Sequence, residues 1–145
     1  MRFTVYVDAA HSTERGVGAW SFLIYTDLRY IEWIGNKSVF LNSPTCAEDI
    51  AIGLACRYLM DNMMLDKTDI VTICSDSLSS IRIMSDILDG KRKETHSNIL
   101  IEDSFKAIKE LSEKCSVAFM KVRGHKPVLN PNICVDRLSK CYLRG

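Results

Sequence analysis

The chain has 145 residues, of which 47% are hydrophobic and 26% charged, and its formal net charge is +1. This composition is typical of a soluble globular protein, and we expect residues 1–145 to form a single domain. The size excludes a dependence on disulfide staples, and no apolar run approaches the length of a membrane helix.

The six cysteines and the N-terminus indicate the compartment. No Cys-x-x-Cys pair and no Cys/His cluster at zinc spacing is present, and most of the cysteines lie within apolar runs. We interpret them as buried free thiols, which suit a reducing environment. The first residues lead directly into a strand pattern, which argues against a signal peptide. We therefore expect a cytoplasmic protein, or one from another reducing intracellular compartment, without membrane association.

The N-terminal third of the chain predicts three strands. Residues 2–8 alternate, with Phe3, Val5 and Val7 on one face. A polar loop at residues 11–15 follows, and residues 19–26 and 30–35 are two further runs rich in aromatic and β-branched residues. Because the connections are short, we expect these strands to form an antiparallel meander.

The remainder of the chain alternates helices with strands. Apolar spacing and capping residues predict, in order, a helix from Ser43-Pro44-Thr45 to about Met60, a buried strand at 69–75, helices at 77–88 and 98–114, a strand at 117–122, a loop at 123–131 and a helix at about 132–142. The order βββαβααβα predicts an α/β fold with a five-stranded mixed sheet and helices packed on its faces.

Two acidic residues follow apolar, strand-like runs. Asp8 comes after Tyr6-Val7, and Asp76 comes after Cys74-Ser75. Each has a purely structural explanation. Asp8 would start a turn, and Asp76 would cap the N-terminus of the helix that begins at Ser77.

Two further acidic residues lie on predicted helices. Glu48 has the spacing of a capping box with Thr45, and Asp49 beside it would favour the helix dipole. Asp136 would pair with Lys140 one turn later. These structural explanations are respectable one by one, but they do not account for the four acidic residues together.

The predicted topology brings Asp8, Glu48, Asp76 and Asp136 towards one place. The carboxyl ends of parallel strands and the adjacent helix N-termini meet at one edge of an open α/β sheet. Four carboxylates there would repel one another unless cations intervened. Oxygen ligands with open positions favour Mg²⁺ or Mn²⁺ over zinc, and two such ions ~3.5–4 Å apart suit phosphodiester hydrolysis. We therefore predict two Mg²⁺ ions per site, for which Mn²⁺ would substitute.

Nearly the whole chain resembles ribonuclease H type 1. The resemblance is carried by five motifs in order: Asp8-Ala9-Ala10, Gly16-Val17-Gly18-Ala19-Trp20, Ala47-Glu48, Ser75-Asp76-Ser77, and Val122-Arg123-Gly124-His125 followed by Asn132 and Asp136. Each motif alone is weak, but all five in this order, with the expected elements between them, are specific. The resemblance implies an RNase H-like fold over residues 1–145.

The resemblance also implies roles for the site residues. Asp8 would bridge two Mg²⁺ ions, and Asp136 would hold the ion that activates the attacking water. Glu48 and Asp76 would hold the ion that stabilises the leaving 3′ oxygen. His125 would assist proton transfer or product release. The positions that would contact nucleic acid are Ala10, Thr45, Cys46, Ser77, Lys126 and Asn132.

The implied activity is cleavage of the RNA strand of an RNA/DNA hybrid, leaving 5′-phosphate and 3′-hydroxyl ends. We expect a monomer without an obligate protein partner. Residues 117–145 carry six basic and one acidic side chain, which would suit a polyanion. Two alternatives stay open. One is a DNA junction resolvase, since Pro44-Thr45-Cys46 stands where the family has asparagines. The other is a non-catalytic nucleic-acid-binding domain, against which the intact acidic set argues.

Overall fold

The computed structural model describes residues 1–12, 14, 17–26, 30–34 and 44–122. Its elements are β1 (Arg2–Ser12), β2 (Val17–Tyr25), β3 (Tyr30–Ile34), α1 (Pro44–Asn62), β4 (Ile70–Ser75), α2 (Leu78–Leu88), α3 (Ile99–Lys114) and β5 (Ser116–Lys121). This order confirms the predicted elements as far as β5. The predicted loop at 123–131 and the final helix at 132–142 lie outside the described residues.

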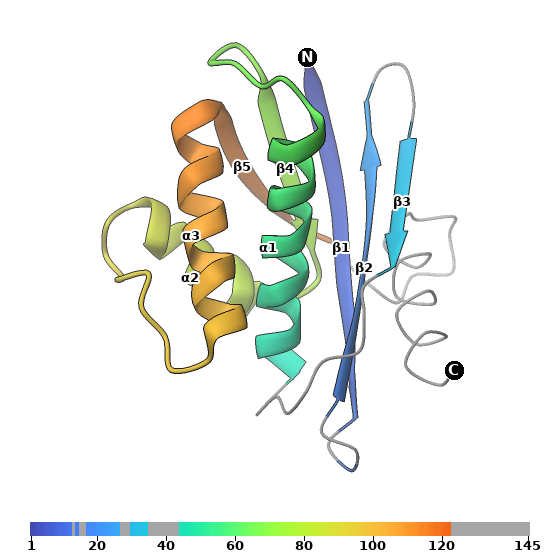
Figure 1. Ribbon diagram of the computed structural model, residues 1–145, viewed down its shortest axis with the longest axis vertical. Helices are drawn as coiled ribbons and strands as arrows, with labels where there is room; N and C mark the ends of the chain where they lie inside the picture. Colours follow the sequence, from blue (N-terminus) through green and yellow to red (C-terminus); the bar gives the residue numbers. More distant parts are fainter. Residues whose placement is uncertain (13, 15–16, 27–29, 35–43, 123–145) are drawn as a thin grey trace.

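The five strands form one mixed sheet in the order β3-β2-β1-β4-β5 (Figure 1). Neighbours β1 and β2, and β2 and β3, are antiparallel, which confirms the meander. Strand β4 pairs in parallel with β1 on one side and with β5 on the other. The fold class is therefore α/β with a five-stranded mixed sheet, as the element order predicted.

Strand β1 is longer than predicted, and this changes the setting of Asp8. It runs to Ser12 instead of ending at residue 8, because β2 pairs with it as far as Ser12↔Val17. The parallel pairing with β4 stops earlier, at Tyr6↔Cys74. Asp8 therefore lies inside a strand, opposite Ser21, and does not start a turn.

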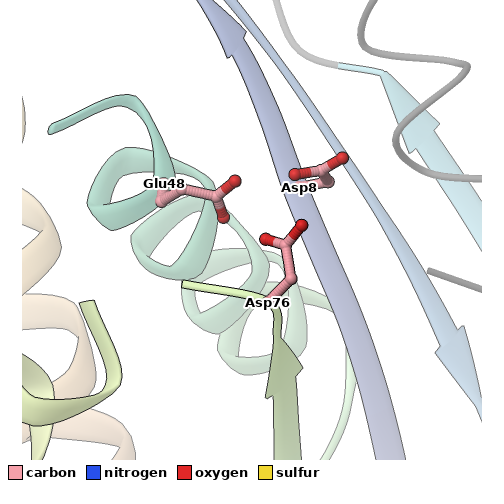
Figure 2. A group of neighbouring side chains, drawn as sticks. All are labelled: Asp8, Glu48 and Asp76. Atoms are coloured by element: carbon pink, nitrogen blue, oxygen red, sulfur yellow. The ribbon is translucent and has the colours of Figure 1, made fainter. Parts of the chain in front are cut away.

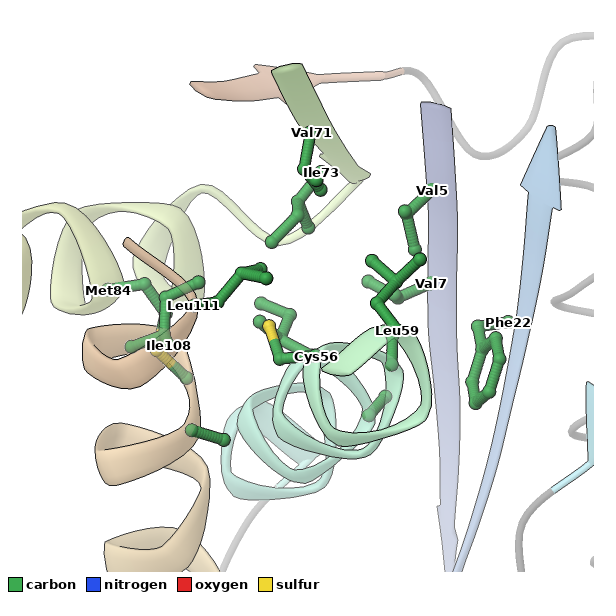
Figure 3. Close-up of a cluster of buried hydrophobic side chains, with 14 of the residues drawn as sticks. Val5, Val7, Phe22, Cys56, Leu59, Val71, Ile73, Met84, Ile108 and Leu111 are labelled. Atoms are coloured by element: carbon green, nitrogen blue, oxygen red, sulfur yellow. The ribbon is translucent and has the colours of Figure 1, made fainter. Parts of the chain in front are cut away.

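The hydrophobic core lies between the sheet and the helices, with α1 at its centre (Figures 1 and 3). On β1 the buried residues are Phe3, Val5 and Val7, as the alternation predicted. Helix α1 packs against β1 and β2 on one side and against α3 on another. Its apolar residues are consequently buried around most of its circumference, which is typical of a helix that is covered on several sides.

Helix α2 buries the centre of its predicted apolar face but not its first residue. Apolar spacing predicts Leu78, Met84 and Ile87 among its inward residues. Met84 and Ile87 are buried, together with Ser80, whereas Leu78 is 39% exposed. The three buried residues follow the i, i+4, i+7 spacing of a single helix face. Strand β4 is likewise less covered than predicted, because Ile70 at its start is exposed.

The cysteines whose side chains the structure describes are buried. Cys56, Cys74 and Cys115 are buried free cysteines, as predicted for thiols within apolar runs. Burial raises the pKa of the Cys74 thiol to about 11, so it stays protonated at neutral pH. Among the helices that the structure describes, none combines the length and the apolar character that crossing a membrane requires.

Gly53 marks the closest approach of α1 to α3. A Cβ atom added there would lie 2.5 Å from the Cα of Ser104, so helix backbones would have to separate. Overpacking costs ~1–3 kcal/mol, and the alanine gains ~1 kcal/mol in helix propensity. Gly53→Ala should therefore lower the free energy of unfolding by about 1 kcal/mol. Urea denaturation measures this. Ser104→Gly in the same chain should restore only part of the loss, because the Cα stays. Wild-type stability of Gly53→Ala would refute the close approach.

Candidate metal centre

Three acidic side chains from distant parts of the chain meet at one edge of the sheet. Asp8 lies on β1, Glu48 lies near the start of α1, and Asp76 directly follows β4. One carboxylate oxygen from each lies within 4.8 Å of the others. Figure 2 shows the three carboxylates turned towards a common point. The sequence predicted this convergence for these three residues.

The sheet topology explains why Asp8 and Asp76 are neighbours. The parallel strands β1 and β4 share their last pair at Tyr6↔Cys74, and each aspartate follows two residues later, Asp8 within β1 and Asp76 directly after β4. Glu48 is held against both strands. Its Oε1 accepts a hydrogen bond from the Ala9 amide at 3.2 Å, and its Oε2 accepts one from the Ser75 hydroxyl at 3.4 Å. The carboxylate of Glu48 is therefore fixed between the two strands that carry the aspartates.

The capping explanations for two of these residues are wrong. Helix α1 begins at Pro44, so Thr45 lies inside the helix and cannot cap it together with Glu48. Proline is favoured at the first helical position, where no amide donor is needed. Helix α2 is capped by Ser77, whose side chain accepts a hydrogen bond from the Ser80 amide at 3.3 Å, and not by Asp76. The N-cap of α2 is therefore Ser77, and the carboxylate of Glu48 bonds to Ala9 and Ser75 instead of to the start of α1.

Burial makes it unfavourable for the three carboxylates to be ionised together without a cation. Asp8 is 2% exposed and Glu48 7%, whereas Asp76 is half-buried. The pKa of Glu48 is raised from 4.5 to about 7, chiefly by burial and also by the charge of Asp76, although hydrogen bonds with Asp8, Ala9 and Ser75 oppose this rise. A divalent cation would offset this repulsion, and carboxylate oxygens are the ligands that Mg²⁺ and Mn²⁺ prefer. The three residues therefore fit a divalent metal.

Sequence reasoning missed the role of Asp49. We predicted that it would favour the dipole of α1, but it is 3% exposed and accepts a hydrogen bond from Ser80 of α2. Burial raises the pKa of Asp49 from 3.8 to about 6, and the hydrogen bond from Ser80 and the charge of Arg92 oppose this rise. The available signal was helical spacing, which places Asp49 on the same face of α1 as Ile52 and Cys56.

The other predicted site residues fall into two groups. Ala10 is buried on β1, Thr45 and Cys46 lie in the first turn of α1, and Ser77 caps α2. All four are close in sequence to the three carboxylates. The rest of the predicted set lies outside the described residues: Asp136, His125, Lys126 and Asn132. Their places in the site stay predictions.

Comparisons with known proteins agree with this arrangement. The family model for RNase H matches residues 1–143. The N-terminal RNase H domain of Rv2228c from Mycobacterium tuberculosis, solved as a fusion with maltose-binding protein, superposes with a TM-score of 0.67 at 14% identity, over 99% of this chain and 94% of that one. RNase H1 from the halophilic archaeon Halobacterium salinarum superposes with a TM-score of 0.64 at 15% identity, over 99% and 98%. No curated protein matches the chain.

The family assignment rests on the sequence match, and the two superpositions show that the fold is shared at low identity. Members of the family are nucleases that generally use divalent metal ions and act on RNA/DNA hybrids. The clustered carboxylates of Asp8, Glu48 and Asp76 agree with this chemistry. Because the match extends over nearly the whole sequence, the chain belongs to the RNase H family and is a ribonuclease H.

Proposed function

We propose that the chain hydrolyses the RNA strand of RNA/DNA hybrids with Mg²⁺, for which Mn²⁺ substitutes, using two ions per site. The observation that carries the proposal is the convergence of Asp8, Glu48 and Asp76, two of them buried, within 4.8 Å. We further propose that residues 1–145 act as a single domain and as a monomer, without an obligate protein partner. The buried free thiols favour a reducing intracellular compartment, for which we propose the cytoplasm.

The proposed ligands are the three clustered carboxylates together with Asp136. When bound, the ions would polarise the scissile phosphate and lower the pKa of a bound water. Glu48 must lose its proton to serve as a ligand, and its hydrogen bonds from Ala9 and Ser75 support the ionised form. We assign proton transfer or product release to His125, on the basis of its sequence motif.

The proposed reaction is a displacement at phosphorus. The oxygen of a water molecule forms a bond to phosphorus while the bond from phosphorus to the 3′ oxygen breaks. The water loses a proton, and the leaving 3′ oxygen gains one. The products are therefore a 5′-phosphate and a 3′-hydroxyl.

The proposed substrate contacts come from positions next to the carboxylates. They are Ala10, Thr45, Cys46 and Ser77, with Lys126 and Asn132 from the C-terminal region. Ala10 and Ser77 directly adjoin the segments that carry Asp8 and Asp76. Selection of RNA over DNA at the cleaved strand would depend on contacts with the 2′-hydroxyl.

A panel of labelled substrates tests the proposal. RNA/DNA hybrid, double-stranded RNA, double-stranded DNA and a four-way DNA junction are each incubated with Mg²⁺ and with EDTA. We expect cleavage of the hybrid alone, only with Mg²⁺, and products that carry 5′-phosphate ends. Cleavage of the junction instead of the hybrid would replace this function with that of a resolvase. Binding of nucleic acid without any cleavage would indicate a non-catalytic domain.

A further inference from the structure

Asp76 lies between two serines that are both anchored to neighbouring groups. The hydroxyl of Ser75 donates a hydrogen bond to Oε2 of Glu48 at 3.4 Å and accepts one from the Ser77 amide at 3.1 Å. This first route connects the backbone on both sides of Asp76 to the carboxylate of Glu48. The backbone is also held by the residue that follows β5, because the Val122 amide donates a hydrogen bond to the Ser75 carbonyl at 2.9 Å.

A second series of hydrogen bonds connects the same segment to Asp49, the residue after Glu48 on α1. The hydroxyl of Ser77 donates to Oγ of Ser80 at 3.1 Å. Ser80 in turn donates to the carboxylate of Asp49. Adjacent residues on α1, Glu48 and Asp49, are thereby linked to Ser75 and to Ser77, the two neighbours of Asp76. Two anchors on one rigid helix restrict both the position and the rotation of the segment between them.

The hydrogen bond between Ser80 and Asp49 is buried, so a polar pair at this position requires an explanation. Ser80 is fully buried and Asp49 is 3% exposed. Oδ1 of Asp49 is buried without a hydrogen-bond partner among the described residues. Burying a carboxylate with so few partners is costly, and an apolar side chain would join α1 to α2 more favourably. A polar pair is explained if Asp49 and Ser80 hold neighbouring groups in a fixed position through their hydrogen bonds.

We propose that Asp49 and Ser80 are positioning residues, which hold the Ser75–Ser77 segment so that the carboxylate of Asp76 stays within metal-binding distance of Glu48. This inference rests on the proposed function. Neither residue contacts the metal or the substrate in this proposal. They act through Ser77, whose amide and hydroxyl belong to the two routes. Removing a group that hydrogen-bonds to a metal ligand and orients it typically lowers metal affinity or activity by ~10–100-fold.

The test measures metal affinity apart from catalysis. Binding of Mn²⁺ to the full chain is measured by calorimetry for wild type, Ser80→Ala, Asp49→Ala and Asp49→Asn, with Ser85→Ala in the same helix as the matched control. Ser80→Ala and Asp49→Ala should weaken Mn²⁺ binding about tenfold. Asp49→Asn keeps an oxygen that accepts from Ser80, so its affinity should stay within about threefold of wild type. Ser85→Ala should bind as wild type does.

Kinetics on the hybrid separate positioning from a general loss of stability. For Ser80→Ala we expect kcat to fall about tenfold at limiting metal, whereas KM for the hybrid changes less than about twofold. Thermal unfolding in EDTA identifies variants that fail to fold. If Ser80→Ala does not fold, the comparison of Asp49→Ala with Asp49→Asn decides, because only the first removes the acceptor.

The outcomes separate the inference from the proposed function. Wild-type Mn²⁺ affinity in both alanine variants would overturn the positioning role. Wild-type protein that binds Mn²⁺ but cleaves no hybrid would refute the proposed function, while the affinities of the variants would still decide the inference. A wild type that binds neither Mn²⁺ nor Mg²⁺ would overturn both.

Discussion

Asp76→Asn is expected to abolish hybrid cleavage, with a loss of ~10³-fold or more in kcat, while the protein stays folded. Asparagine keeps the size of the side chain but removes one of three carboxylates whose oxygens lie within 4.8 Å. Because Asp76 is half-buried and does not cap α2, its replacement leaves the helix terminus intact. Single-turnover cleavage at saturating Mg²⁺ measures the loss, and circular dichroism reports the fold.

Asp86→Asn is the matched control for this change. Asp86 is an exposed aspartate on α2, outside the carboxylate cluster, so its replacement should leave turnover unchanged. A further readout is metal binding, which should weaken only for Asp76→Asn. If Asp76→Asn cleaves the hybrid at the wild-type rate, Asp76 is not part of the site.

Glu48→Gln is expected to inactivate the enzyme and at the same time to stabilise the metal-free protein above neutral pH. Burial raises the pKa of Glu48 from 4.5 to about 7. Between these two pH values the folded state holds a proton that the unfolded chain has released. The free energy of unfolding of the wild type in EDTA should therefore fall as pH rises from about 4.5 to 7, and Glu48 should account for up to ~3 kcal/mol of this fall.

Glutamine removes this part of the pH dependence, since it does not ionise. The variant keeps a smaller decline from Asp49, whose pKa burial raises from 3.8 to about 6. At pH 8 in EDTA, Glu48→Gln should exceed wild type in unfolding free energy by ~2–3 kcal/mol, and the two should converge near pH 4.5. Urea denaturation across this pH range gives both curves.

Magnesium should reverse the order of wild type and Glu48→Gln in free energy of unfolding, because the ion binds only the ionised site. Mg²⁺ should stabilise the wild type at pH 8, much less at pH 5, and Glu48→Gln at neither pH. The exposed Glu113 provides the control, and Glu113→Gln should follow the wild-type curve. Wild-type and Glu48→Gln curves that run parallel in EDTA would show that Glu48 is not held in a protonated state.

The order of strands and helices was predictable because each element carries its own periodicity. The alternation of Phe3, Val5 and Val7 identified the buried face of β1, and the parallel pairing of β1 with β4 follows from the strand–helix order. The convergence of Asp8 with Asp76 then needs only the rule that such strand ends share an edge. The end of β1 was not predictable in this way, since its last residues depend on pairing with β2.

The errors arose where a local rule competes with a contact between elements. The spacing of Thr45 and Glu48 fits a capping box, yet Glu48 bonds to Ala9 and Ser75 instead. Asp49 next to it fits a role at the helix dipole, yet it is buried and accepts a hydrogen bond from Ser80 of α2. Leu78 looked like a core residue for the same reason, because the rotation of α2 about its axis is set by its neighbours.

The wide separation of the three carboxylates along the chain has a consequence for the folding pathway. The hydrogen bonds of Glu48 to Ala9 and Ser75 span 39 and 27 residues, and they join segments that meet only when β1, α1 and β4 have assembled. Closing such long loops is slow, and a parallel strand pair requires the intervening helix to be in place. The carboxylates are therefore dispersed, and individually weak as ligands, throughout the early stages of folding. A divalent ion cannot template the sheet; it can only slow the unfolding of a sheet that has already formed.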